Sequence, residues 1–599
     1  MSILYRDILY PIFEELQHDK KSLASCLRVN KTWCEIAVQI LWRNPWEHLD
    51  YVHDEKKLLL NVIISHLSDE KRTNLNQQFS FITNSHRRPL FNYISFCRHL
   101  NLEIIEYTVH SHIKNEEIRN DILKLFINKN AKYTHLYIPS YNDYHLIPGA
   151  EHCFSEIKFL KCDGRVNDNN LALLTKVCKS IKELQIYIHK SVNNYGISKL
   201  IENQVSLFSI RLVCRYSSDA SDDSMFCKTL ENSLIKHANT IQYFYICGKL
   251  ETQILSSFVN LKTLILNGGW FDDYSYLENA SLPSLQILDA NNINTKSLTN
   301  LIKNSGEKLT KLRIYNNNSG FLEVINNNII IRTLYQHCPN LISLKLFYKE
   351  VNVLELEKLL IKCQYLNSLE LFFNWNFPQV NFINWDRFFN ILVISSPPSL
   401  FKFTFHYPFY KPKLESLKLF FNNWKGRHPM SLIIFTESNL AHEEKLNNLI
   451  SKYKAKGVIK KFDNNFYNND DSIESKEKSK RVVEDLKTKA EKTAILQSGG
   501  IGTQQKKNAQ SEDEQFEDAL TSPKLNAVSI VLRSKEEHEN YNNLNNEFSK
   551  RMKEISNNEK ETSSKTCDKD NVDSEDDNLN ENKKHIMKSQ SVREHADDE

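Results

Sequence analysis

Two short stretches decide the fold, LISLKL (Leu341–Leu346) and LNSLEL (Leu366–Leu371). Each has an apolar residue, two others, an apolar residue, one other and a final apolar residue. Alternation of apolar and other residues at the end of the pattern is typical of a short strand with one buried face. The pattern has clear further copies at Leu261, Leu309 and Leu414, and weaker ones at Tyr133, Phe154, Ile181, Leu207, Ile241, Leu285 and Leu400.

The spacing of these copies points to a repeat. All but the last of the successive intervals are 20 to 34 residues, and many lie near the roughly 20–29 residues of a leucine-rich repeat. Helical spacing fills the intervals, for example in NLALLTKVCKS (170–180) and VLELEKLLIKC (353–363). We therefore predict an α/β fold over residues 131–465, in which short parallel strands and return helices stack into a curved solenoid.

Cysteines recur at one position of the predicted repeat. Cys178, Cys338 and Cys363 each precede a copy by three residues. The chain resembles, in this respect, the cysteine-containing leucine-rich repeats often found behind an F-box. A second position of the repeat lies three residues after a copy. We predict that its side chains are buried and form hydrogen bonds with backbone groups where the strand ends. Its occupants are Cys162, Asn317, Asn374 and Asn422.

The amino terminus has helical rather than strand spacing. Leu4, Ile8 and Ile12 lie four residues apart and form one apolar stripe of a helix. Pro11 is tolerated there if the helix begins near Asp7, which puts the proline within about the first turn, and would otherwise kink the helix. A second helix face is predicted at Trp33, Ile36, Ala37, Ile40 and Leu41.

The stretch LYRDILYPIFEELQHDKKSLASCLRVNKTWCEIAVQILW (Leu4–Trp42) resembles an F-box. The leading Leu, the IF..L block, an apolar-rich middle, the V.K.W block and the closing LW occur in order, with Tyr5 where the family has proline. The resemblance implies a small helical module that docks onto the adaptor subunit of a cullin-RING ubiquitin ligase. By this resemblance, the residues that would bind the adaptor or form the core of the module are Leu4, Ile8, Ile12, Phe13, Leu16, Leu23, Val29, Trp33 and Leu41.

The domain boundaries follow from these patterns and from charge. We expect the F-box-like module at 1–48, a helical spacer with possible early repeats at 49–130, the solenoid at 131–465 and a tail at 466–599. From Asp470 to the end there are 22 Lys and Arg against 30 Asp and Glu, whereas the preceding residues hold 55 and 44. The acidic tail is poor in aromatic residues, so we predict that it is disordered.

Composition also limits where the protein acts. The 12 cysteines include no CxxC pair, the amino terminus has charges where a signal peptide needs an apolar stretch, and no apolar run could span a bilayer. We expect a cytoplasmic or nuclear protein, or one found in both compartments, with no membrane partner.

The predicted inner face of the sheet is aromatic and basic. Residues between the buried positions of a strand face the other side of the sheet, and Tyr and Arg often dominate binding energy at interfaces. Lys158, Lys418 and Phe420 also fall on this face if the copies at Phe154 and Leu414 are strands. The candidate substrate-binding residues are Tyr187, Arg211, Tyr243, Tyr245, Lys311, Arg313, Tyr315, Lys345, Phe347 and Phe372.

No catalytic or cofactor motif is present in the sequence. QSGGIGTQQKK lacks the spacing of a phosphate-binding loop, AHEEKL lacks the second histidine of a zinc motif, and no G-x-S-x-G occurs. We therefore expect a non-catalytic substrate receptor of an SCF-type ubiquitin ligase, without a cofactor. Two alternatives remain: a leucine-rich scaffold whose amino-terminal helices only cap it, and a nucleic-acid-binding solenoid, which the diffuse charge and missing Lys/Arg runs disfavour.

Overall fold

The computed structural model describes twelve segments of the chain. They are residues 6–47, 49, 53–78, 88–140, 142–189, 193–214, 224–268, 274–315, 327–373, 383–406, 412–436 and 440–466. All of them belong to the first of two compact units, Met1–Val528. The predicted acidic tail lies outside the described residues, apart from its first residue.

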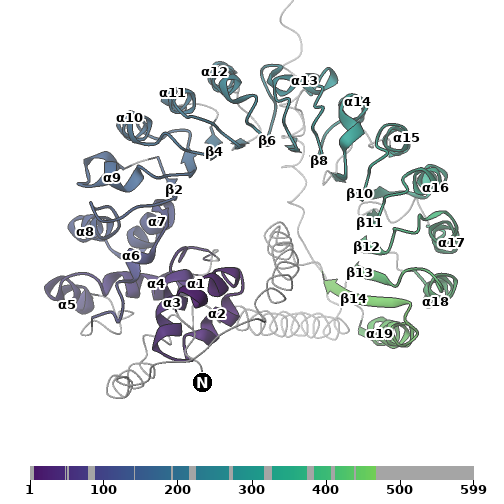
Figure 1. Ribbon diagram of the computed structural model, residues 1–599, viewed down its shortest axis with the longest axis horizontal. Helices are drawn as coiled ribbons and strands as arrows, with labels where there is room; N and C mark the ends of the chain where they lie inside the picture. The colour runs from purple at the N-terminus through teal and green to yellow at the C-terminus, as the bar shows by residue number, and fades with distance from the viewer. Residues whose placement is uncertain are drawn as a thin grey trace, which may run out of the picture. The chain divides into compact units, whose positions relative to one another are not determined.

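One sheet of 14 strands organises the described residues. Its order is β1 to β14 without exception, and every neighbouring pair is parallel. The strands form the inner side of a curved array and helices α8 to α18 its outer side (Figure 1). This is the predicted α/β solenoid of leucine-rich repeats. The strands are β1 His99–Asn101, β2 His135–Ile138, β3 Phe159–Asp163, β4 Glu183–Ile188, β5 Ser209–Cys214, β6 Tyr243–Cys247, β7 Thr263–Asn267, β8 Ile287–Asn291, β9 Lys311–Tyr315, β10 Ser343–Tyr348, β11 Ser368–Phe373, β12 Lys402–His406, β13 Met430–Thr436 and β14 Ile459–Phe466.

Helices precede the first strand and connect most of the others, while β6 and β7 are joined through a 3₁₀ turn. The helices of the amino-terminal region are α1 Arg6–Glu15, α2 Lys20–Cys26, α3 Lys31–Leu41, α4 His53–Ile64, α5 Asp69–Gln78 and α6 Tyr93–Phe96. Those after β1 are α7 Leu102–His112, α8 Glu116–Phe126, α9 Ala150–Phe154, α10 Asp168–Val177, α11 Gly196–Glu202, α12 Ser224–Leu234, α13 Ser275–Glu278, α14 Thr295–Ser305, α15 Asn327–His337, α16 Val353–Lys362, α17 Trp385–Ser395, α18 Leu414–Asn423 and α19 Leu440–Ala455. Short 3₁₀ turns lie at η1 Tyr144–Leu146, η2 Ile235–His237, η3 Ile254–Ser257, η4 Gly306–Lys308 and η5 Glu350–Asn352.

The core lies between the sheet and the outer helices. Leu344 on β10 pairs in register with Leu369 on β11, and Leu346 pairs with Leu371. All four side chains are buried, and burying each one contributes about 1.5–3 kcal/mol. The strand prediction from LISLKL and LNSLEL is confirmed.

Asparagine begins many of the helices. An N-cap side chain that accepts a hydrogen bond from the backbone N–H three residues later satisfies one of the unpaired donors of the first turn. The described asparagines that do this are Asn30, Asn101, Asn115, Asn167, Asn294 and Asn384.

The repeated cysteines lie at the opposite ends of the helices. Cys178 caps the carboxyl end of α10, and its Sγ donates to the carbonyl oxygen of Phe154, 3.0 Å away in the preceding repeat. Cys363 caps α16 and contacts the carbonyl oxygen of Cys338 at 4.0 Å. The thiols are buried, and burial raises the pKa of Cys178 and Cys338 to about 12. They stay protonated and join neighbouring repeats.

The predicted strand at Leu414 is wrong, because LESLKL forms the first part of α18. Leu419, which the strand pattern would bury, is 52% exposed, whereas Phe420 is buried. Lys418 is an exposed helix residue, so neither it nor Phe420 belongs to the inner face. The strand of this repeat, β13, begins at Met430.

The copy at Phe154 was placed three residues too early. Phe154 ends α9, and β3 begins at Phe159, so Lys158 precedes the strand. Cys162 is a buried residue of β3 and Asn422 lies in α18, so neither occupies the predicted position after a strand. Asn317 and Asn374 lie outside the described residues, and β1, β13 and β14 were not predicted.

Candidate functional site

Three helices, α1 to α3, form a small module at the amino terminus. Phe13, Leu23 and Leu41 are buried between them, so these carried-over residues form the module core. The Trp33 ring is half-buried and meets Phe13 edge-on, with ring centroids 5.0 Å apart. The predicted helical module is present in the structure, while its binding to an adaptor stays a prediction.

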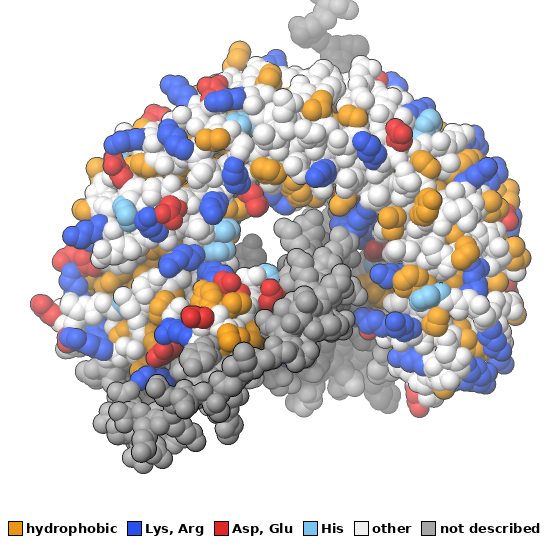
Figure 2. Space-filling model, in the orientation of Figure 1, with side chains coloured by type: hydrophobic (Ala, Val, Ile, Leu, Met, Phe, Trp, Pro, Cys, Tyr) orange, Lys and Arg blue, Asp and Glu red, His pale blue; other side chains and the backbone are white. Residues whose placement is uncertain are grey.

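Other carried-over residues remain on the surface of this module. Ile8 is 50% exposed, Ile12 48% and Val29 54%. Ile8 and Ile12 lie one turn apart on α1, and Figure 2 shows hydrophobic side chains gathered over the module. We call Ile8 and Ile12 the apolar face; Val29 is exposed in the turn between α2 and α3. Leu16 is half-buried, and Leu4 lies outside the described residues.

Pro11 sits deeper in its helix than the sequence suggested. Helix α1 begins at Arg6, so Pro11 is the sixth residue and lies beyond the first turn. It has no N–H to donate to the carbonyl group one turn earlier. A hydrogen bond of 2.7 Å from Arg43 Nη2 to Glu14 Oε1 ties this helix to the segment after α3.

The module is joined directly to the first strand of the sheet. The Arg43 carbonyl oxygen accepts hydrogen bonds from the N–H groups of Arg98 (2.9 Å) and His99 (3.2 Å). The Arg98 carbonyl oxygen accepts in the same way from Thr134 and His135 of the next repeat. Arg43 therefore provides the first rung of the ladder that continues through the solenoid. Trp46 Nε1 adds a hydrogen bond of 2.6 Å to the His99 carbonyl oxygen.

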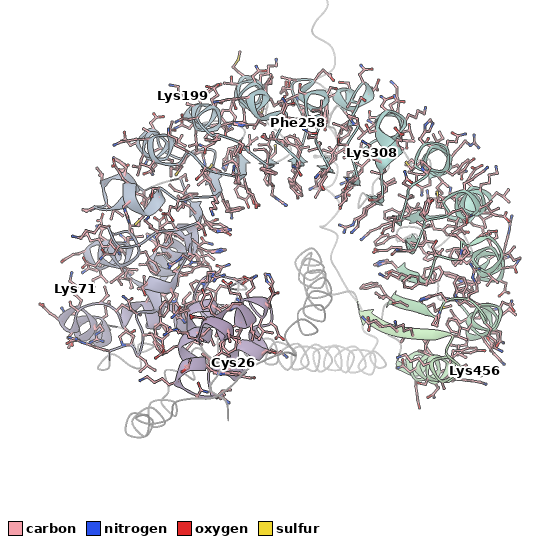
Figure 3. All side chains as sticks on the ribbon, in the orientation of Figure 1. Cys26, Lys71, Lys199, Phe258, Lys308 and Lys456 are labelled. Atoms are coloured by element: carbon pink, nitrogen blue, oxygen red, sulfur yellow. The ribbon has the colours of Figure 1, made fainter. Side chains whose placement is uncertain are left out.

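The inner face of the sheet carries the predicted substrate-binding residues. Figure 3 shows side chains of the strands reaching the inner rim of the array. Tyr315 is the last residue of β9, and its side chain lies outside the described part of the structure. Half-buried side chains on this face are those of Tyr187, Arg211, Tyr243, Tyr245, Lys311, Arg313, Lys345, Phe347 and Phe372.

A cluster of tyrosines and cations lies across β3 to β6. Lys161 Nζ lies 4.9 Å from the centre of the Tyr187 ring. On the next strands, Arg211 Nη1 donates to the Tyr243 hydroxyl oxygen at 2.7 Å, and the Arg211 Cζ atom lies 4.4 Å from the centre of the Tyr245 ring. We call Arg211, Tyr243 and Tyr245 the Arg211 cluster. These contacts order side chains that would otherwise move freely.

An aromatic row lies at the other end of the inner face, on β10 to β13. Phe347, Phe372, His406 and Phe435 stand on successive strands in register. Successive ring centroids are 5.3, 4.0 and 4.3 Å apart. The three phenylalanine rings of the row are half-buried and give the inner face apolar surface of a kind that binds protein side chains.

Glu370 lies beside this row between two nitrogen donors. Its carboxylate is 3.0 Å from Lys345 Nζ and 2.8 Å from His406 Nε2. Burial raises the pKa of Glu370, but the hydrogen bond from His406 and the Lys345 charge outweigh burial and hold that pKa at about 2. Burial lowers the pKa of His406 despite this carboxylate. Near neutral pH the imidazole is therefore uncharged, and its Nε2–H donates to Glu370.

Sequence reasoning left several inner-face residues out of the candidate site. Lys161 was missed because the copy at Phe154 was misplaced. Phe435 was missed because MSLIIF (430–435) is a nearly continuous apolar run rather than a copy of the pattern. His406 could have been found by continuing the alternation, since it directly follows the Leu400 copy (400–405) and lies two residues after the inner-face position Thr404.

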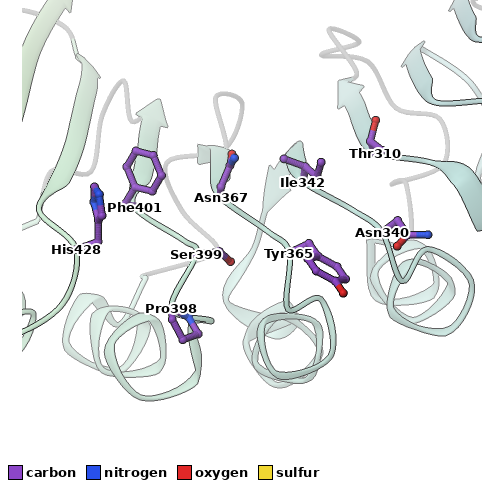
Figure 4. A pocket seen from close by; sticks show the side chains of 9 residues that line it. All are labelled: Thr310, Asn340, Ile342, Tyr365, Asn367, Pro398, Ser399, Phe401 and His428. Atoms are coloured by element: carbon purple, nitrogen blue, oxygen red, sulfur yellow. The ribbon is translucent and has the colours of Figure 1, made fainter.

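A wide hollow lies on the flank of the solenoid where β9 to β12 begin. Its volume is about 600 Å³, and Figure 4 shows the side chains around it. The lining residues are Thr310, Asn340, Ile342, Tyr365, Asn367, Pro398, Ser399, Phe401 and His428.

Across the described segments of the chain, no group of three or more His, Cys, Asp or Glu is arranged to hold a metal ion. None of the helices that the structure describes is both long and apolar enough to cross a membrane.

Comparison with known proteins yields structural likenesses but no family. No family model and no curated protein matches the chain. The leucine-rich repeat-containing protein LegL7 from Legionella pneumophila aligns with 51% of this chain and 90% of its own length, at 17% identity and a TM-score of 0.30. Similarity at this level carries no argument about function.

Proposed function

We propose that this chain is the substrate-recognition subunit of an SCF-type cullin-RING ubiquitin ligase. The observation that carries the proposal is the apolar face of the F-box-like module, on a chain whose remaining described residues build a binding solenoid. Isoleucine side chains about half exposed are a natural surface for another protein to cover. The adaptor would bind the apolar face, and a protein substrate would bind the inner face of the sheet.

The chain's contribution to ubiquitin transfer would be proximity. Holding a substrate beside a separately bound ubiquitin-loaded enzyme raises its effective concentration, and this needs no catalytic residue in the receptor. The proposal therefore agrees with a sequence that has no catalytic motif. It also implies that the protein works in the cytoplasm or the nucleus.

A second function is favoured by the joint between the module and the sheet. Arg43 and Trp46 cover the backbone edge of β1 through direct hydrogen bonds. A protein-interaction scaffold would need the three helices for this purpose alone, because an uncovered strand edge invites pairing with other chains. In that case the apolar face would have no adaptor.

Capture of the adaptor distinguishes the two functions. We expect the full-length protein to retain the cullin-ligase adaptor subunit on affinity purification, and Ile8→Ser with Ile12→Ser to reduce the retained amount at least tenfold. The two side chains are half exposed, so the double variant removes binding surface and leaves the buried core of the module in place.

The matched control removes exposed apolar side chains from a solenoid helix. Leu354 and Ile361 on α16 are 56% and 52% exposed, and their double serine variant should retain the adaptor fully. A wild-type chain that never retains the adaptor, or an Ile8→Ser, Ile12→Ser variant that retains it unchanged, would contradict the proposal and leave the scaffold function.

A further inference from the structure

Arg211 is a cation whose side chain is fixed in place on the inner face. Its Nη1–H donates to the Tyr243 hydroxyl oxygen, and its guanidinium lies against the Tyr245 ring. In register, Gln185 on β4 and Tyr245 on β6 flank it, and both are uncharged. A guanidinium has five N–H donors, and the hydrogen bond to Tyr243 uses one of them.

Three other cations of the inner face, Lys161, Lys345 and Arg313, lie beside carboxylates. Lys161 Nζ lies 3.0 Å from Glu103 Oε2 on α7, and Lys345 Nζ lies 3.0 Å from Glu370 Oε1. Arg313 Nη1 lies 3.2 Å from Asp289 Oδ2 on the adjacent strand. Among the residues that the structure describes, no carboxylate lies within ion-pair distance of Arg211. Within that part of the chain, nothing neutralises its charge, which is available to a binding partner.

We propose that the Arg211 cluster binds an aspartate or glutamate side chain in an extended segment of the partner protein. A carboxylate can accept two parallel hydrogen bonds from one guanidinium, and this pairing is among the stronger polar contacts in proteins. The rings of Tyr243 and Tyr245 hold the guanidinium in position, so less rotamer entropy is lost on binding. The inference rests on the proposed function only in treating the inner face as the substrate-binding surface.

The local charge favours a carboxylate over a phosphorylated side chain. A phosphate ester carries about −1.5 to −2 charges near neutral pH and is best matched by several cations. Arg211 has uncharged neighbours in register on both sides, and Lys161 is engaged with Glu103. Among the described residues around it, Arg211 therefore offers one cation, which matches one carboxylate.

The test uses the full-length protein and a displayed library of random dodecapeptides as the probe. We expect the enriched peptides to share an Asp or Glu next to an aromatic or aliphatic residue. For the strongest peptide, Asp→Asn or Glu→Gln in the peptide and Arg211→Gln in the protein should each weaken binding about tenfold, as loss of a charge-assisted hydrogen bond implies. Arg211→Lys keeps the charge without the paired donors, so its loss should be intermediate.

Arg313→Gln is the matched control. It removes an inner-face arginine that Asp289 already neutralises, and peptide affinity should change less than twofold. The proposal is overturned if Arg211→Gln and Arg313→Gln have equal effects while both proteins stay folded by circular dichroism. It is also overturned if a phosphoserine peptide binds more tightly than its aspartate counterpart, or if the chain's own SEDEQFEDAL (511–520) outcompetes every selected peptide.

Failure of this inference can be told apart from failure of the proposed function. Peptide binding depends on the inner face, whereas adaptor capture depends on the apolar face. Loss of adaptor capture alone would leave the Arg211 cluster as a recognition point of a scaffold. Loss of Arg211-dependent peptide binding alone would leave a ligase receptor that reads its substrate elsewhere.

Discussion

Glu370 shows at the scale of one residue how the inner face is held together. Its carboxylate is more stable as an anion in the folded protein than in the unfolded chain, because Lys345 and His406 donate to it. An acid whose pKa is depressed by folding contributes stability above its unfolded pKa, near 4.3, and loses that contribution as the pH falls through the folded value. Here the loss should occur between pH near 4.3 and about 2.

Replacing this carboxylate tests the electrostatic account. Glu370→Gln should be less stable than wild type at pH 7 by about 1–3 kcal/mol, and the difference should shrink as the pH falls towards 3. Urea unfolding followed by circular dichroism at pH 7, 5 and 3 gives the comparison. A stability difference that stays constant over this range would show that the two donors do not hold the pKa down.

At the scale of elements, nearly the same letters form a strand in one repeat and a helix in another. The last four residues of LISLKL lie in β10, whereas LESLKL lies in α18. Leu414, Leu417 and Phe420 are three residues apart and give a helical stripe that overlaps the strand pattern. The interval decides between them: the Leu400 copy lies 14 residues before Leu414, and a parallel crossover needs a dozen or more residues beyond the strand itself.

The site was predictable to the extent that it depends on alternation. The candidate residues from Tyr187 to Phe372 whose side chains are described lie on the inner face, because period-two patterning follows from strand geometry alone. Ion pairing was not predictable. Asp289 neutralises Arg313 across 24 residues of sequence, and only the register between β8 and β9 brings them together. For the same reason, the sequence could not predict that Arg211 has no carboxylate partner among the described residues.

Arg427 offers a test of how neighbouring repeats support one another. From the segment after α18, its guanidinium donates to the carbonyl oxygens of Val393 (2.6 Å), Ser396 (2.5 Å) and Pro397 (3.1 Å) at the end of α17. Val393 is among the last residues of α17, whose carbonyl groups have no partner within the helix, and Ser396 and Pro397 follow the helix end. Arg427→Met should destabilise this end of α17 by about 2–3 kcal/mol, seen as faster amide exchange there. Unchanged exchange would mean that water replaces the guanidinium without cost.

At the scale of the whole described unit, the two edges of the sheet are treated differently. The module covers the edge of β1 through Arg43 and Trp46. No strand pairs with the outer edge of β14 among the described residues. The fold is therefore anchored at its amino-terminal edge, where the helical module and the repeats share one hydrogen-bond ladder.

Trp46→Phe tests this anchoring, because phenylalanine keeps the ring burial and removes the Nε1–H donor. We expect amide exchange around His99 to accelerate about tenfold, equivalent to losing one hydrogen bond of about 1.4 kcal/mol, while exchange in α1 to α3 stays constant. Equal acceleration in the module and in β1 would show that Trp46 stabilises the unit as a whole.

The shared rung at Arg43 also sets how the protein would work as a receptor. Because direct hydrogen bonds join the module to the first repeat, a bound substrate would be held in one orientation relative to the adaptor. A flexible linker would instead let the substrate sample a wide volume. The position of each substrate lysine would then decide whether it is modified. Lysines that face the incoming ubiquitin would be modified, and equally accessible lysines on the far side of the substrate would not.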